Sequence, residues 1–351
     1  MQIQRAVLDE AELQGVLNQG QGSALWAYLN TREQQSPAFR PAHILYYLGG
    51  LIAIGAMTLF MTLGWQRFGA SSLLVISLCY AALAIGMTEA LRKRPAMALP
   101  AGVGATFALV MVPMAVYAVQ NLLGLWPANV AHGMAYRDYH TVIDGRWLAM
   151  EGITLVAAAL ALWRYRYPFL VLPVAVTLWY MSMDLAPFLF GGQPVPMMSA
   201  HAQWVSLWFG LVMLLIALLV DLRSRMSQDF AFWLYLFGVL TFWGGLTSME
   251  SHSELGKLGY CILNLLMIGV GAALGRRVFA VFGGFGVALY LGYLSHTVFK
   301  DSMLFPVALT AIGLLVVVAG VLWQRHEEAI GVRLRGFLPA AVRRVVEQRA
   351  A

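Results

Sequence analysis

The chain has 351 residues, of which 60% are hydrophobic and 11% are charged, and its formal net charge is +6. This balance is far more apolar than that of a soluble globular domain, so the composition predicts a polytopic membrane protein. Of the 23 Lys and Arg residues, 18 fall in segments predicted to lie on one membrane face, which explains the positive charge and leaves nucleic-acid binding without support. The five on the other face are Arg67, Arg137, Arg146, Lys257 and Lys300.

The first segment, residues 1–41, is the least apolar part of the chain. Two short helical patterns, around Leu8 and Leu25, are separated by glycines and followed by Pro37 and Pro41. They predict a small cytoplasmic helical segment next to the membrane. Four acidic residues and the lack of an apolar core argue against a cleaved signal peptide.

Ten apolar runs follow between residues 42 and 325, the expected transmembrane bundle. A helix rises 1.5 Å per residue, so about 20 apolar residues cross a hydrocarbon core of roughly 30 Å. We therefore expect an all-α fold, a polytopic membrane helical bundle of about ten transmembrane helices. Their expected ranges are about 43–65, 70–91, 96–122, 147–163, 169–190, 203–220, 230–247, 258–275, 278–298 and 303–323. In the third range, Pro100 and Pro113 predict a bend.

Basic residues mark one end of every second helix in this set. The even-numbered helices end near Arg92, Arg164, Arg223, Arg276 and Arg325. Because Lys and Arg concentrate in cytoplasmic loops, we expect ten crossings with both ends of the chain in the cytoplasm, and we expect the bacterial inner membrane. The longest polar connection, 126–146, then lies outside.

The last segment, 326–351, alternates apolar and basic residues at helical spacing. An amphipathic cytoplasmic helix lying on anionic lipids of the inner leaflet explains this pattern, with each basic residue contributing on the order of 1 kcal/mol. A nucleic-acid-binding arm is the alternative.

An internal repeat is suggested by three pairs of matching motifs. They are Tyr47-Leu48 with Gly50 and Tyr235-Leu236 with Gly238, then Leu91 to Arg94 and Leu274 to Arg277, then Trp163-Arg164 and Trp323 to Arg325. Residues 43–163 and 230–323 would form two copies with the same membrane orientation, a parallel repeat of the first four and last four helices, joined by linker helices at 169–220. Alternatively, these motifs recur by chance, since aromatic and basic residues concentrate at membrane interfaces.

The opening of the bundle also resembles a known family. A cytoplasmic helical pair, the stretch Tyr47 to Gly55, a short turn after Trp65 and a second helix closed by basic residues are similar to a bacterial membrane family catalogued as domain of unknown function 2157. The resemblance covers about residues 1–95. It implies a bacterial inner-membrane protein and transfers no catalytic residue.

Polar side chains inside the apolar runs are the candidate site. Glu151, Asp184 and Asn264 lie about five or six residues from the outer ends of their helices, and His201 and His296 lie nearer the outer surface. A charged carboxylate in a bilayer costs several kcal/mol unless it meets a partner or water. No Lys or Arg is expected at that depth, so the two acids must carry a proton, reach water or hold a cation. We expect a shared polar cavity that opens outward.

Three interpretations of these acids remain open. In the first, they brace a structural or scaffold subunit of a larger membrane complex. In the second, they bind a proton or small ion in a transporter or channel-like protein. In the third, they join Asp138, His140, Asp144 and His201 in an outer-face enzyme that acts on a lipid-linked substrate. The chain lacks the phosphate-binding, metalloprotease, paired-cysteine and hydrolase motifs of soluble enzymes. The sequence therefore names no catalytic residue, cofactor or substrate, and predicts no metal site.

Overall fold

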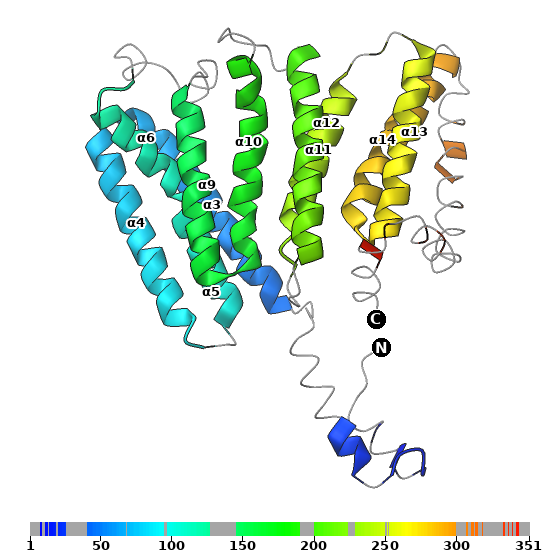
Figure 1. Cartoon of the computed structure of the whole chain (residues 1–351), viewed down its shortest axis with the longest axis horizontal. Coiled ribbons are helices and arrows are strands. Elements are labelled where there is room, and N and C mark those ends of the chain that lie inside the picture. Colours follow the sequence, from blue (N-terminus) through cyan, green and yellow to red (C-terminus); the bar gives the residue numbers. More distant parts are fainter. Residues whose placement is uncertain are drawn as a thin grey trace.

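The computed structural model describes residues 41–67, 69–94, 97–126, 145–189, 200–223, 229–249, 251 and 253–299, with single residues and short stretches within 8–25 and 307–343. Every element in this part of the chain is a helix, and most of the helices stand side by side (Figure 1). They are α3 (Pro41–Arg67), α4 (Ala70–Leu91), α5 (Ala98–Val110), α6 (Val112–Leu122), α9 (Gly145–Tyr165), α10 (Val171–Leu189), α11 (Ala200–Arg223), α12 (Phe232–Ser248), α13 (Glu254–Leu274) and α14 (Arg277–Phe299), with a 3-10 turn, η2 (Pro168–Leu170), before α10.

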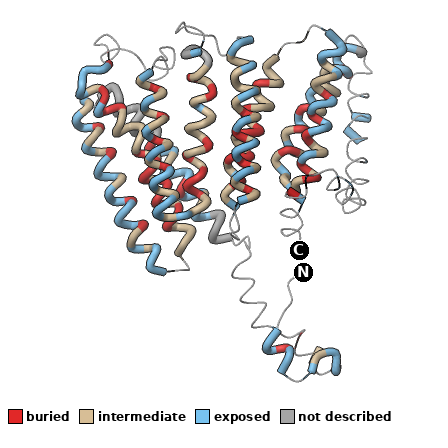
Figure 2. Tube along the Cα trace, in the orientation of Figure 1, coloured by how far each residue is buried: buried red, intermediate tan, exposed pale blue. Residues whose placement is uncertain are grey.

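Seven helices of the described part are long and apolar enough to cross a membrane. They are Ala70–Leu91, Ala98–Leu122, Gly145–Tyr165, Pro168–Leu185, Ala200–Arg223, Glu254–Leu274 and Arg277–Thr297, and shorter apolar stretches cover Leu45–Met57 and Phe232–Ser248. Large apolar side chains such as Leu83, Leu160 and Leu215 are exposed along these helices, and exposed positions alternate with buried ones around them (Figure 2). Apolar surface of this extent is typical of a protein embedded in lipid.

The described helices overlap the predicted ranges from 43–65 to 278–298. The predicted tenth helix at 303–323, the loop at 127–144, the helical segment at 1–41 and the tail at 326–351 lie outside the described residues, apart from scattered positions and the ends of these ranges. The structure thus bears out a membrane helical bundle, and the number of ten helices stays a prediction.

The predicted bend in the third helix is a break between α5 and α6. Pro113 has no backbone N–H to donate to Leu109, and its ring crowds that carbonyl. The chain adapts with a tighter turn in which the Met111 N–H donates to Ala108. Pro100 causes no break, because it lies in the first turn of α5, where a missing N–H costs little.

Local capping defines the ends of α13. The Ser253 side chain accepts the backbone N–H of Gly256 at the start, and Glu254 lies in the first turn, where the helix dipole favours a negative charge. At the other end, Gly275 has φ +67°, and the N–H of Arg276 donates back to Gly271. This turn reverses the chain into α14.

Small residues set how closely the helices pack. α11 packs along α12, α13 packs along α14, and α10 contacts α9, α11 and α12. A Cβ atom at Gly283 would lie 2.5 Å from the backbone oxygen of Asn264, so α13 and α14 approach through a glycine contact. This agrees with the enrichment of small residues at helix interfaces inside membranes.

Candidate functional site

The α9–α10 hairpin brings Glu151 and Asp184 together. Glu151 lies 17 residues before Pro168 in the turn, and Asp184 lies 16 residues after it. Because two antiparallel helices have the same rise per residue, such positions lie at the same height along the helix axes. Glu151 is six residues from the start of α9, so this level is about 9 Å inside that end of the helix.

The two carboxyl groups are buried and interact with each other. Each residue is only 6% exposed, and the two side chains lie close enough to interact. A carboxylate can only accept hydrogen bonds, so two neighbouring carboxyl groups can bond to each other only when one of them carries a proton. The second oxygen of Glu151, Oε2, is buried and has no hydrogen-bond partner. Within the described part of the chain, no Lys or Arg forms an ion pair with either acid.

Aromatic side chains lie beside this region, at the end where α9 begins. Trp147 lies one turn before Glu151 and contacts Trp126, whose ring also contacts Tyr117. All three rings are buried. The Arg146 guanidinium lies 4.6 Å from the Trp126 ring, one member of this aromatic cap of Tyr117, Trp126 and Trp147. The acids therefore lie in a packed region, and the outward-opening polar cavity around them stays a prediction.

Asn264 lies in another part of the bundle. Its amide oxygen accepts from the Trp243 indole at 3.1 Å, and its amide nitrogen donates to the Tyr260 carbonyl at 2.8 Å. A Cβ atom at Gly286 would lie 1.9 Å from the Asn264 amide oxygen, so this side chain occupies space between α12, α13 and α14. The fully buried amide is satisfied there and does not join the acid pair.

The two histidines of the predicted cavity lie on other helices than the two acids. His201 is at the start of α11 and His296 is near the end of α14, and both are exposed. Among the described residues, no group of three or more His, Cys, Asp or Glu side chains is placed to hold a metal ion. Asp138, His140 and Asp144, which the enzyme interpretation needs, lie outside the described residues.

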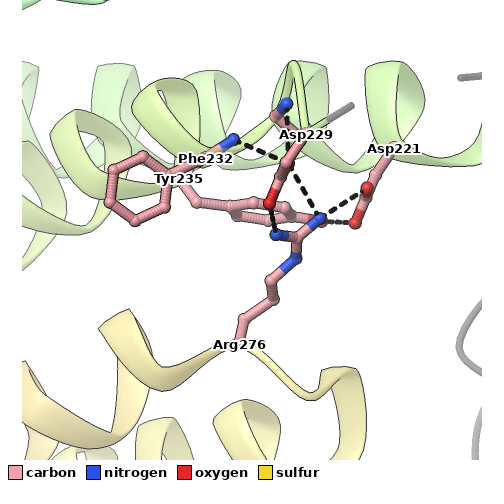
Figure 3. Close-up of polar contacts among 6 residues, drawn as sticks. Asp221, Asp229, Phe232, Tyr235 and Arg276 are labelled. Carbon is pink, nitrogen blue, oxygen red and sulfur yellow. Dashed lines mark hydrogen bonds and ion pairs between the residues drawn. The ribbon is translucent and has the colours of Figure 1, made fainter. Parts of the chain in front are cut away.

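A polar cluster that the sequence did not reveal lies where α11 and α13 end (Figure 3). The guanidinium of Arg276, after α13, donates to Asp221 at 2.7 Å and to both carboxylate oxygens of Asp229. Its centre lies 5.0 Å from the Tyr235 ring, and the Tyr235 hydroxyl donates to Asp221 at 3.3 Å. Asp229 also accepts the backbone N–H groups that begin α12. This cluster joins α11, α12 and the α13–α14 turn.

Arg276 is held in its charged form by this cluster. Burial lowers the pKa of the guanidinium, but the hydrogen bonds and charges of Asp229 and Asp221 outweigh burial and raise the pKa above its ordinary value. The partners lie 47 and 55 residues away in sequence, so the sequence indicated Arg276 only as one of the basic residues that predict a cytoplasmic helix end. A possible signal was Asp221, an acid within the otherwise basic end of its helix.

A cavity of about 510 Å³ lies where the end of α12, the start of α13 and the end of α14 meet. Lys257, Tyr260 and Tyr293 are among its lining residues. The Lys257 ammonium donates to Glu254 at 2.8 Å and to the Tyr293 hydroxyl, and lies 4.2 Å from the Tyr293 ring centre. Sequence reasoning used Lys257 only as an outer-face charge.

Comparison with protein-family models, curated proteins and solved structures finds no match to this chain. The candidate sites therefore depend on the geometry of the chain itself.

Proposed function

We propose that this chain is a membrane transport protein that binds and releases a proton at the Glu151–Asp184 pair. The observation that carries the proposal is the contact between two buried carboxyl groups without a basic partner in the described part of the chain. Ionisable groups inside a membrane are costly and commonly mark ion or proton pathways. A purely structural contact would be made at lower cost by amides or hydroxyls.

The broken helix beside the pair supports a transport function. α9 carries Glu151 and contacts both α5 and α6, which separate at Met111. Discontinuous helices commonly border the substrate and coupling-ion sites of transporters. A proton is favoured over a divalent cation, because calcium takes six to eight oxygen ligands and two side chains supply four oxygens at most.

An infrared measurement on the purified full chain tests the bound proton. A protonated carboxyl group gives a C=O stretching band distinct from that of a carboxylate, and we expect such a band in the native protein. Glu151→Gln and Asp184→Asn should each remove it, because each variant leaves one carboxylate that can accept from the new amide. The matched control is Glu254→Gln, an exposed acid, which should keep the band.

Transport is tested separately, with the same variants in proteoliposomes. We expect that a panel of small solutes contains one whose uptake follows an imposed pH gradient in the native and Glu254→Gln proteins. The Glu151→Gln and Asp184→Asn variants should each lose this uptake. A band that persists in both pair variants contradicts proton binding there. If both variants fold and every solute behaves as in native protein, the acids are structural and the scaffold interpretation is favoured.

The topology and the repeat belong to the same proposal. The ends of α4, α9, α11 and α13, which carry basic residues or lead directly into them, lie toward the same side of the bundle (Figure 1). This arrangement supports ten crossings with both chain ends in the cytoplasm, and a bacterial inner membrane. Membership of domain of unknown function family 2157, and contact of the 326–351 tail with anionic lipids, stay predictions.

Neighbour relations support the parallel repeat. α4 packs mainly on α5, which α3 also contacts, just as α13 packs mainly on α14, which α12 also contacts. The copies differ in detail: Gly50 approaches Val103 on α5, whereas Gly238 approaches Leu214 on α11. A superposition of 43–163 on 230–323 about an axis along the membrane normal is the expected result.

A further inference from the structure

We infer that the cavity between α12, α13 and α14 binds a zwitterionic phospholipid, of the phosphatidylethanolamine class, from the leaflet at the α13 N-terminus. Its volume of about 510 Å³ is within the range of small-molecule sites. This site is distinct from the Glu151–Asp184 pair, so the inference does not depend on the proposed proton site.

The residues that line the cavity are polar near the start of α13 and apolar one to two helical turns further in. Lys257 lies near the start of α13, and Leu263, six residues further along, lies about 9 Å deeper. On α14, Tyr293 lines the polar part and Leu289 lies one turn deeper. An amphiphile whose chains point toward the centre of the membrane matches this order of groups.

The cavity is open to the side. Leu263 and Leu289 line it, yet 41% and 53% of their respective surfaces are exposed. In a membrane, such side chains face lipid. A lipid can therefore enter from the bilayer without leaving it.

The charges at the rim match a zwitterionic head. Lys257 offers an ammonium that can donate to a phosphate, and Glu254, 71% exposed at its side chain, offers a carboxylate that can accept from a lipid ammonium. The present Lys257–Glu254 pair is a surface pair on one helix, of the kind that water and ions readily replace. A singly anionic head would satisfy Lys257 but would meet Glu254 as a like charge.

Native mass spectrometry of the full chain with added phosphatidylethanolamine, phosphatidylcholine or phosphatidylglycerol tests the inference. We expect phosphatidylethanolamine to bind best, since phosphatidylcholine cannot donate to Glu254 and phosphatidylglycerol lacks the ammonium. Lys257→Gln should weaken phosphatidylethanolamine binding about tenfold, by loss of a charge-assisted hydrogen bond. Glu254→Gln should remove the preference over phosphatidylglycerol.

A second pair of variants separates the cavity from the general lipid surface. Leu263→Trp places a larger side chain in the cavity. Leu266→Trp places the same side chain at an exposed α13 position that does not line the cavity. The first should lose the bound lipid and the second should keep it, with both chains showing native thermal unfolding. Equal binding of the three lipids to the native chain, or retention of phosphatidylethanolamine by a folded Leu263→Trp variant, would overturn the inference.

Discussion

The Arg276 guanidinium donates to the Asp221 carboxylate at 2.7 Å, which ties the turn after α13 to the end of α11. Both side chains are nearly buried, with about a tenth of each exposed. The direct helix contacts between the α11–α12 and α13–α14 hairpins are mainly those of α12 with α14. The polar cluster around Arg276 is therefore a main connection between the two hairpins at this end of the bundle.

Arg276→Met should destabilise the protein by on the order of 3 kcal/mol, because it leaves the carboxylates of Asp221 and Asp229 without their shared cation. Arg277→Met is the matched control, since it removes the same charge from the next residue, which is exposed and makes no ion pair within the described part of the chain. Denaturant or thermal unfolding in detergent measures the difference. Equal stability of the two variants would contradict a stabilising role for the cluster.

Sequence reasoning predicted the helices well because the signal is local. An apolar run of bilayer length is visible in the chain itself, and Pro113 indicated the break that separates α5 from α6. Even the meeting of Glu151 and Asp184 follows from their similar distances to the turn at Pro168.

The side-chain partners were beyond such reasoning because they depend on helix rotation and neighbour choice. Asn264 was grouped with the acids by depth alone, whereas its helix turns it toward Trp243. Arg276 finds its acids on helices far away in sequence, and Lys257 lines a cavity made by three helices. Depth in a membrane can be counted along one helix, but the face that a residue presents is set by tertiary packing.

The α13–α14 contact gives a prediction with an internal control. Gly283→Ala should destabilise by about 1 to 3 kcal/mol, because the new Cβ would lie 2.5 Å from a backbone oxygen that cannot rotate away. Gly286→Ala should displace the Asn264 amide and break its bond with Trp243. Gly284→Ala meets no atom within 4 Å and should be neutral or slightly stabilising. Thermal unfolding of the three variants measures the order, and a Gly284 variant as unstable as the Gly283 variant would contradict it.

The predicted topology is tested by cysteine labelling in whole cells. Cys79 and Cys261 are both free thiols and are first replaced by serine. A cysteine in place of Asp138 should then react with an impermeant reagent added outside, and a cysteine in place of Ser224 should not, because the basic helix ends predict that Ser224 is cytoplasmic. Labelling only at position 224 would reverse the orientation.

A double-mutant cycle tests whether Glu151 and Asp184 act as one unit. Glu151→Leu leaves Asp184 as a buried carboxyl group without its partner, and Asp184→Leu does the same to Glu151, so each single change should cost about 1 to 3 kcal/mol.

The double variant removes both carboxyl groups, and no buried acid is left unsatisfied. Its cost should therefore be smaller than the sum of the single costs, by roughly 0.5 to 3 kcal/mol, the range found for residues in direct contact. Asp184→Leu combined with Glu254→Leu is the control, because the Glu254 side chain is exposed, it pairs with Lys257 on α13, and its effect should simply add. Unfolding in detergent gives all the free energies. If the costs at Glu151 and Asp184 also add, the two carboxyl groups do not share a proton, and the basis for a joint site is lost.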